Sequence, residues 1–410
     1  MTDPRTVALA VLDQIRQGRY TEIRDRFPDG LRPMVTAEAL AAAWDGELAR
    51  LGPVTSVGEP TSGDVRGRAT TVTVPLRFAR GELNLQVVVA ETGELAGLQF
   101  VPAAQPWQPP PYADPDRFDE QEVAVLDVPG TLSLPRATGA CPGLVLLGGS
   151  GPNDRDATIG ANKPFKDLAW GLASRGVAVL RFDKVTFAHP EQAAAKPAFT
   201  LADEYLPHAV AAVRLLGEHA ERVFLAGHSL GGTVAPRVAV AEPAVAGLVL
   251  LAAGAEPVHW SAVRQIRYLA SLDPATAAAA QPGIDLLTAQ AERVDSPDLG
   301  PDTPADQLPF GAPSAYWLDL RDYDAVGTAA GLDLPILLCQ GERDYQVTVT
   351  GDLARWQDGL AGRPDVTVRR YPADNHFFLP GEGPSHPGEL AVAGHVDPQV
   401  VTDVGGWLTR

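Results

Sequence analysis

The chain has 410 residues, 45% of them hydrophobic, and a formal net charge of −18. This length predicts two or three domains with a sizeable core. The acidic balance argues against nucleic-acid binding, which needs basic patches. No basic leader followed by an apolar run opens the chain, and no apolar run is long enough to cross a bilayer. We therefore expect a cytoplasmic protein without a nucleic-acid or membrane partner.

The two cysteines, Cys141 and Cys339, are too few for a metal cluster or a disulfide framework. Each lies beside an apolar run, which predicts two reduced core residues. No group of histidine, cysteine and carboxylate residues has the spacing of metal ligands. We therefore expect no metal ion and no organic cofactor.

Residues 1–103 are expected to form a small α+β domain. Apolar residues recur with helical spacing over 7–16 and 37–51. Alternation of apolar and polar residues then predicts three strands, at 69–78, 83–89 and 95–101. A few helices packed on a small antiparallel sheet would explain this order. The proline-rich residues 104–115 that follow predict an extended, semi-stiff linker.

Residues 116–410 are expected to form an α/β domain. After a leading pair of strands, short apolar runs of the kind buried on both faces alternate with helical patterns. The runs lie at 143–147, 177–182, 223–226, 246–252, 335–340 and 366–371. This alternation predicts a mostly parallel sheet with helices on both faces.

Residues 256–333 interrupt this alternation with helical pieces and a proline-rich stretch. An insertion at the carboxyl end of a strand in such a sheet lies over the functional site. We therefore expect a helical lid here, with a surface elaboration away from the site as the alternative.

The motif that indicates chemistry is Gly-His-Ser-Leu-Gly at 227–231. A short β-type run precedes it and small residues follow where a helix should begin, which is the context of a nucleophile elbow. Glycines are needed there because a side chain would crowd the neighbouring strand or helix. We predict that Ser229 is a nucleophile. The alternative is a glycine-rich turn with a solvated serine.

A serine nucleophile needs a base and an orienting acid, and on such a turn the chain order is serine, acid, histidine. Asp344 follows a buried strand and is the expected acid. Glu342 is the rival, because it lies two residues nearer the strand. We favour Asp344, since the chain needs a turn after Gly341 to aim a carboxylate back toward the base.

His376 is the expected base, because it follows the last strand-like run and precedes the final helix. His386 and His395 also lie downstream of the acid, but neither directly follows a strand. His228, beside the nucleophile, cannot fold back to serve it, and we interpret it as a residue that packs the elbow. Lys184 lies near a strand end and is assigned no role.

An acyl-transfer intermediate also needs donors for its oxyanion. The backbone N–H of Leu230, directly after the nucleophile, is one expected donor. The loop at 148–152, Gly-Gly-Ser-Gly-Pro, should supply the second. We favour the Ser150 N–H, with Gly149 and Gly151 left open. The loop lacks the spacing of a dinucleotide or phosphate cradle.

Residues 116–410 resemble bacterial α/β-hydrolases of the dienelactone-hydrolase and acyl-thioesterase-like branch. The segments that carry the resemblance are GGSGPNDRD, GVAVLRFDK, GHSLGG, QGERDYQV, NHFF and GHVD. The resemblance implies Ser229, Asp344 and His376 as a triad. Gly148 departs from the family's common His-Gly-Gly pattern, which leaves the second oxyanion donor open. Residues 1–103 resemble, more weakly, a cone-shaped domain of the cystatin or ketosteroid-isomerase-like kind.

The expected activity is hydrolysis of an ester, thioester or lactone through an acyl-enzyme on Ser229. An acyltransferase, a cyclase or a peptidase would use the same triad, and a non-catalytic binding protein is the alternative from another class. The expected partner is a small acyl substrate. For the amino-terminal unit two interpretations stay open: it caps the site or mediates self-association, or it only stabilises the fold.

Overall fold

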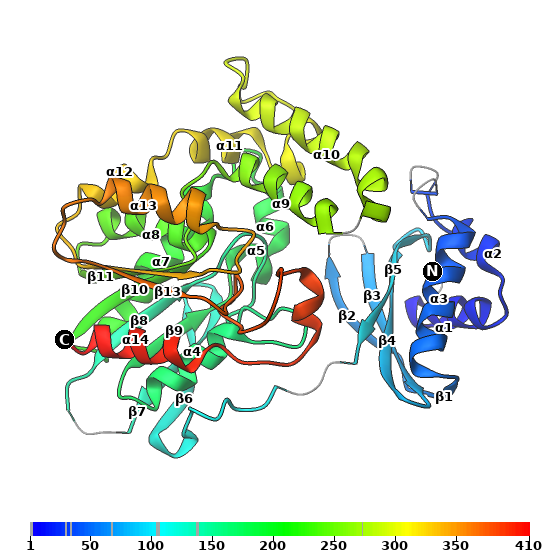
Figure 1. Cartoon of the computed structure of the whole chain (residues 1–410), viewed down its shortest axis with the longest axis horizontal. Helices are drawn as coiled ribbons and strands as arrows, with labels where there is room; N and C mark the ends of the chain where they lie inside the picture. Colours follow the sequence, from blue (N-terminus) through cyan, green and yellow to red (C-terminus); the bar gives the residue numbers. More distant parts are fainter. Residues whose placement is uncertain are drawn as a thin grey trace. The chain divides into compact units, whose positions relative to one another are not determined.

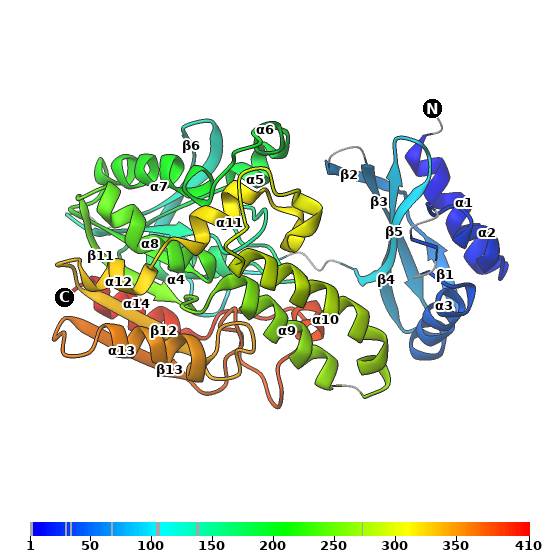
Figure 2. The same cartoon turned by 90° about the horizontal axis from the view of Figure 1, so that it is seen from above.

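The computed structural model describes residues 3–28, 31–32, 35–66, 69–103, 107–136, 139–272 and 274–410 (Figures 1 and 2). Contacts divide the chain into two compact units, Met1–Pro106 and Trp107–Arg410. Part of the segment expected to be an extended linker belongs to the second unit. Trp107 Nε1 donates to Asp167 Oδ1 at 2.7 Å, and the Asp114 N–H donates to Ser174 Oγ at 2.8 Å. Residues 104–106 lie outside the described residues.

In the part of the first unit that the structure describes, three helices pack on a five-stranded antiparallel sheet. The strands run in the order β1-β3-β4-β5, and β2 also pairs with β3. The elements are α1 (Pro4–Arg16), α2 (Tyr20–Arg24), α3 (Ala37–Leu51), β1 (Val54–Val57), β2 (Thr61–Arg66), β3 (Ala69–Phe78), β4 (Gly81–Ala90) and β5 (Leu95–Pro102). Alternate residues of β3 and β4 are buried, and with α1 they form the core of this unit. The predicted α+β organisation is confirmed, whereas the likeness to cystatins stays a prediction.

The second unit is built on an eight-stranded sheet in the order β13-β12-β11-β10-β8-β9-β7-β6. The pairs β6–β7 and β7–β9 are antiparallel and the others are parallel. The bounds are β6 (Phe118–Val125), β7 (Val128–Pro135), β8 (Pro142–Leu147), β9 (Ala178–Phe182), β10 (Arg222–His228), β11 (Val245–Leu251), β12 (Ile336–Gly341) and β13 (Val366–Tyr371). The predicted mostly parallel sheet is confirmed.

Helices cover both faces of this sheet (Figure 1). One face packs on α7 (Leu201–Gly217), α8 (Leu230–Ala241) and α13 (Ala354–Gly359), and the other on α4 (Pro164–Ala173) and α14 (Pro398–Leu408). Successive residues of β8 face opposite sides, Leu144 and Leu146 toward one core, Val145 and Leu147 toward the other. Burial on both faces explains why the strands read as continuous apolar runs. Cys339 is buried in β12, but Cys141 is only half-buried and is not the core residue we expected.

The insertion between β11 and β12 contains four α-helices among its described residues: α9 (Val258–Leu272), α10 (Pro274–Asp295), α11 (Ser314–Arg321) and α12 (Ala325–Ala330). Helices α9 and α10 pack on each other, and α11 contacts α7. In contrast, α12 packs against α8 and α13, and its Ala325 and Ala329 belong to the core between the sheet and helices α7, α8 and α13. This last part of the expected lid therefore belongs to the α/β scaffold.

The carboxyl ends of the parallel strands lie along one edge of the sheet. The loops that follow β13, β12, β10, β8 and β9 carry, in that spatial order, His376, Asp344, Ser229, Gly149 and Lys184. Ligands of open α/β sheets bind outside this edge. The topology thus collects at one edge the residues that the sequence scatters over more than half of the chain.

Candidate active site

Ser229 lies on a sharp turn between β10 and α8. Its φ of 54° and ψ of −122° lie outside the regions that non-glycine residues usually adopt. The flanking glycines fill tight places: a Cβ on Gly227 would lie 2.2 Å from the Gly231 carbonyl oxygen, and one on Gly231 would lie 2.5 Å from the carbonyl oxygens of Leu147 and Gly148. The prediction that these positions tolerate no side chain is confirmed.

Asp344 and His376 are in direct contact. Because a carboxylate only accepts, His376 Nδ1 carries the proton and donates it to Asp344 Oδ2 at 2.7 Å. Asp344 Oδ1 accepts from the backbone N–H groups of Gln346, at 2.7 Å, and Val347, at 3.0 Å. The rival Glu342 instead forms an ion pair with Arg370 at 2.9 Å. The structure therefore places Asp344, and not Glu342, against the expected base.

His228 joins the elbow to the loop that carries His376. Its Nε2–H donates to the His376 carbonyl at 2.9 Å, and the two ring centroids are 4.6 Å apart. Burial, and then the neighbouring His376, lowers the pKa of His228 to about 3. The ring is therefore neutral at physiological pH and acts as a fixed hydrogen-bond donor. This contact is more specific than the packing role that we predicted.

No hydrogen bond joins Ser229 Oγ to the His376 ring in the described residues. The ring's Nε2 is also without a hydrogen-bond partner there, so it is available to a hydroxyl on the neighbouring turn. In structures without substrate such bonds are often long and tighten only in the complex. The structure thus brings Asp344 and His376 together and holds them to the residue that precedes Ser229.

The other downstream histidines lie elsewhere. His395 Nδ1 is 3.2 Å from Asp167 Oδ2, beside α4. His386 precedes the short helix Pro387–Ala391 and forms no hydrogen bond with Asp344. Neither side chain contacts the Asp344 carboxylate, which agrees with the choice of His376 made from the sequence.

Backbone amides beside Ser229 are free to act as donors. In the described part of the chain, the Leu230 N–H at the start of α8 donates to no acceptor, and neither do the N–H groups of Gly149, Ser150 and Gly151. Gly149 packs against the nucleophile, since a Cβ on it would lie 3.1 Å from Ser229 Cβ. The positions fit two oxyanion donors, and the choice within the loop stays a prediction.

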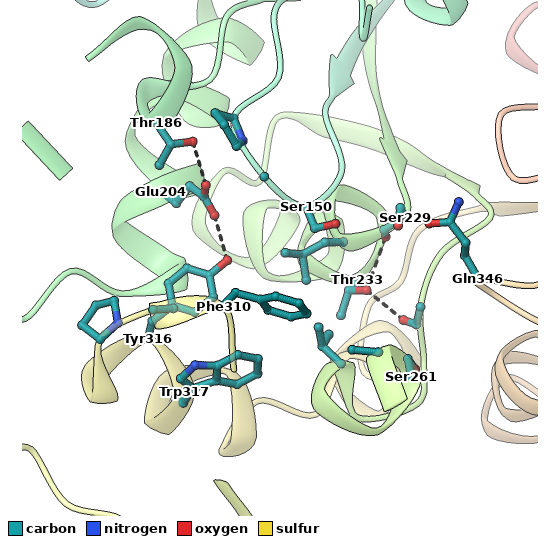
Figure 3. Close-up of a pocket in the computed structure, with 18 of the residues that line it drawn as sticks. Ser150, Thr186, Glu204, Ser229, Thr233, Ser261, Phe310, Tyr316, Trp317 and Gln346 are labelled. Atoms are coloured by element: carbon teal, nitrogen blue, oxygen red, sulfur yellow. Dashed lines mark hydrogen bonds between the residues drawn. The ribbon is translucent and has the colours of Figure 1, made fainter. Parts of the chain in front are cut away.

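A pocket of about 670 Å³ opens beside Ser229 (Figure 3). Its walls are mainly apolar, and the insertion supplies much of them, so this part of the insertion covers the site as a lid would. Representative apolar lining residues are Phe199, Val258, Phe310, Pro313, Trp317 and Val347.

Two carboxylates line this pocket, and each already has a cationic partner. Glu204 Oε1 lies 3.0 Å from Lys184 Nζ, and Glu256 Oε2 lies 3.0 Å from Arg264. Glu204 also accepts from the hydroxyls of Thr186, at 2.9 Å, and Tyr316, at 2.8 Å (Figure 3). Each carboxylate of the described lining therefore has a cationic partner, and Arg264 also pairs with the buried Asp352 at 3.3 Å.

Asp374, two residues before His376, is fully buried, and neither of its carboxyl oxygens accepts a hydrogen bond in the described residues. Burial, and then the negative charge of Asp397, raises its pKa to about 7, against the opposing effect of Arg343. Above pH 4 the unfolded chain releases this proton while the folded chain retains it up to about pH 7. The carboxyl therefore costs stability that grows as the pH rises over this range.

We expect Asp374→Asn to stabilise the protein at neutral pH. At pH 8 the free energy of unfolding should rise by about 2–4 kcal/mol, and the gain should disappear near pH 4. Urea unfolding at a series of pH values measures this difference. The exposed Asp358→Asn is the matched control, for which we expect no such pH dependence. Parallel pH profiles for Asp374→Asn and the unaltered protein would contradict the prediction.

Sequence reasoning missed several residues of the site. They are Asn153, Lys184, Glu204 and Tyr205. Asn153 and Lys184 lie in segments that carry the family resemblance, but no pattern in the sequence assigned a role to any of the four. For Lys184 its position near a strand end was the available signal. No group of histidine, cysteine and carboxylate residues in the described part of the chain could hold a metal ion. None of the described helices has the length and apolar character that a membrane span requires.

Known proteins similar to this chain are hydrolases. A family model described as serine aminopeptidase, S33, matches residues 162–382. Esterase EstD of Thermotoga maritima is 37% identical over 338 residues, which cover 82% of this chain and 78% of that relative.

Solved structures also match. An esterase of Pyrococcus furiosus matches at 16% identity and a TM-score of 0.44, covering 75% of this chain and 95% of that one. A proline iminopeptidase of Mycobacterium smegmatis matches at 20% identity and a TM-score of 0.45, covering 71% of this chain and 98% of that one.

Proposed function

The chain belongs to the serine aminopeptidase S33 family of α/β-hydrolases, and we propose that it hydrolyses carboxylic esters whose acyl group is apolar and uncharged. The observation that carries the proposal is a serine on a strained elbow that opens into an apolar pocket whose two carboxylates are both paired. The relative EstD is named an esterase. Thioesters and lactones, the dienelactone-hydrolase branch and a cytoplasmic location stay predictions.

Ser229, His376 and Asp344 have the roles of nucleophile, base and orienting acid. Ser229 Oγ attacks the ester carbonyl carbon while His376 Nε2 takes the hydroxyl proton, and Asp344 holds the opposite ring nitrogen and stabilises the imidazolium. The resulting oxyanion accepts from the Leu230 N–H and from an amide of the loop at 149–151. His376 then gives its proton to the leaving alcohol. Water, deprotonated by the same nitrogen, releases the acid and restores Ser229.

The pocket favours an esterase over an aminopeptidase. An aminopeptidase must bind the ammonium group of its substrate, and burying an unpaired cation is costly. Glu204 and Glu256 are the carboxylates in the described lining. Lys184 is paired with Glu204, and Arg264 is shared between Glu256 and the buried Asp352. An apolar acyl chain, in contrast, gains from burial against the walls of this pocket.

Two p-nitrophenyl esters test this proposal, because they differ in one group. The 4-methylpentanoyl ester and the leucyl ester share size and leaving group, but the leucyl ester carries an ammonium group. After correction for their rates with free imidazole, we expect kcat/KM to be at least about 10-fold higher for the 4-methylpentanoyl ester, because the ammonium must lose its hydration. A preference for the leucyl ester would indicate an aminopeptidase. Loss of both activities in Ser229→Ala is the control for background hydrolysis.

A further inference from the structure

Lys184 is a buried cation that the mechanism above does not use. It lies just after β9 and its side chain is 4% exposed. The three N–H donors of its ammonium meet three acceptors: the Gly149 carbonyl at 2.8 Å, Tyr205 Oη at 3.0 Å and Glu204 Oε1 at 3.0 Å. Burial lowers the pKa of Lys184 and Glu204 raises it. Removing a charged group from water costs free energy, so a buried ammonium at this position indicates a functional role.

The carbonyl that Lys184 binds belongs to the same peptide group as the Ser150 N–H. The described residues contain no cis peptide bond, and in a trans peptide the C=O and N–H groups point in opposite directions. Fixing the Gly149 carbonyl on Lys184 therefore aims the Ser150 N–H the other way. The hydroxyl of Tyr205 lies within hydrogen-bond distance of the same Gly149 carbonyl, at 2.9 Å, and of the preceding Gly148 carbonyl, at 3.0 Å, and its one proton supports the same orientation of the loop.

Asn153 also fixes the orientation of the carbonyl groups of this loop. Its Nδ2 lies within hydrogen-bond distance of the carbonyl oxygens of Gly149, Ser150 and Gly151, at 3.1, 3.0 and 3.0 Å. The carbonyls of the loop are thus bound by protein donors, while the N–H groups of residues 149–151 have no acceptor among the described residues. Ser150 lines the same pocket as Ser229 (Figure 3).

We propose that Lys184 is a positioning residue for the oxyanion hole, acting through the Gly149–Ser150 peptide group. This inference rests on the proposed function, since it requires an oxyanion at Ser229. Lys184 prevents the peptide from turning its carbonyl toward that oxyanion. A hydrogen bond to a charged donor also polarises the peptide and strengthens its N–H as a donor.

Glu204 connects this arrangement to the lid. It neutralises Lys184 and accepts from Tyr316, which lies on α11 of the insertion, at 2.8 Å. Tyr316, Glu204, Lys184 and the Gly149 carbonyl thus form one continuous set of polar contacts. The position of α11 therefore bears on the orientation of the loop as well as on the size of the pocket.

Lys184→Met tests the proposal, because it keeps the length of the side chain and removes its donors. With p-nitrophenyl hexanoate we expect kcat to fall about 30- to 100-fold and KM to stay within about 3-fold, because an oxyanion donor acts in the transition state. Affinity for an alkyl boronic acid that bonds to Ser229 should fall in parallel with kcat/KM. Lys163→Met is the matched control: Lys163 pairs with Asp156 at 2.8 Å, away from the loop, and should leave both constants unchanged.

The double variant Lys184→Met/Glu204→Gln excludes the trivial effect of an unpaired buried carboxylate. We expect its kcat to stay low, and recovery of kcat would overturn the proposal. An unchanged kcat in Lys184→Met, or a raised KM at unchanged kcat, would overturn it as well.

If Lys184→Met does not fold, Tyr205→Phe provides the test. We expect its kcat to fall about 3- to 10-fold, because a neutral hydrogen bond is lost. An unchanged kcat in this variant would overturn the proposal. Failure of the proposed function is distinguishable, because the unaltered protein would then hydrolyse no ester.

Discussion

Replacing Ser229 with alanine is expected to lower kcat for p-nitrophenyl hexanoate by about 10⁵- to 10⁶-fold, because removal of the nucleophile of a triad abolishes nearly all of its rate acceleration. The residual rate should come from binding and from the oxyanion donors alone, so KM should change little. Steady-state kinetics measures the loss, and labelling by a fluorophosphonate probe should disappear with it.

The alanine variant should keep its fold. An alanine at 229 removes one oxygen from a side chain whose hydroxyl hydrogen-bonds to no described residue, and the strained backbone stays the same. A melting temperature within a few degrees of the unaltered protein is therefore expected. Ser296→Ala, a change in the insertion outside the pocket lining, is the control and should keep full activity. Substantial ester hydrolysis by Ser229→Ala would exclude the proposed acyl-enzyme.

The elbow could be predicted because its determinants are local. Three glycines and a serine within six residues, between a strand and a helix, specify a turn that few other sequences could adopt. The helix at Ala37–Leu51 was predicted from the helical spacing of its apolar residues, and the structure shows that residues at its two ends also support it. Thr36 Oγ1 accepts from the Ala39 N–H at its start, and Gly52 ends it with a φ of 80°. Neighbours in the chain decide such features, so the sequence displays them.

Strands β1 and β2 and the short helices α5 (Val185–Ala188) and α6 (Pro190–Ala195) were not predicted. Strand β1 has four residues, three of them exposed, so it lacks a period-two pattern. Helices α5 and α6 are short; His189 lies between them, and Pro190 is the first residue of α6. Such elements depend on tertiary contacts more than on local propensity.

The polar contacts around the oxyanion loop were also outside the reach of sequence patterns. Lys184 and Tyr205 are 21 residues apart, and both are far from Gly149 along the chain. Strand order brings them together, because β9 lies beside β8 and α7 packs over that pair. Their function depends on which carbonyl each one binds, and the packing of the surrounding residues determines this.

The second large effect is expected for Asp344→Asn, which should lower kcat/KM about 10⁴-fold near neutral pH, because it forces the wrong tautomer on the histidine. Oδ1 of Asp344 accepts from two backbone N–H groups, which cannot reverse their roles, so the oxygen of an asparagine would occupy this position. Its amide nitrogen would then face His376 Nδ1. Nδ1 of His376 would then have to accept a hydrogen bond from this amide, so the ring proton would move to Nε2. Nε2 is the atom that must be unprotonated to take the proton of the serine.

A matched variant separates this role from a general effect of charge. Glu342→Gln removes a carboxylate two residues away whose partner is Arg370, and we expect an unchanged kcat/KM, since surface ion pairs contribute little. Nitrogen-15 NMR of the histidine ring should show the proton on Nδ1 in the unaltered protein and on Nε2 in Asp344→Asn. Activity lost in Glu342→Gln and kept in Asp344→Asn would make Glu342 the orienting acid. Loss in Asp344→Asn without a change of tautomer would mean that the carboxylate acts through its charge on the imidazolium rather than through the position of a proton.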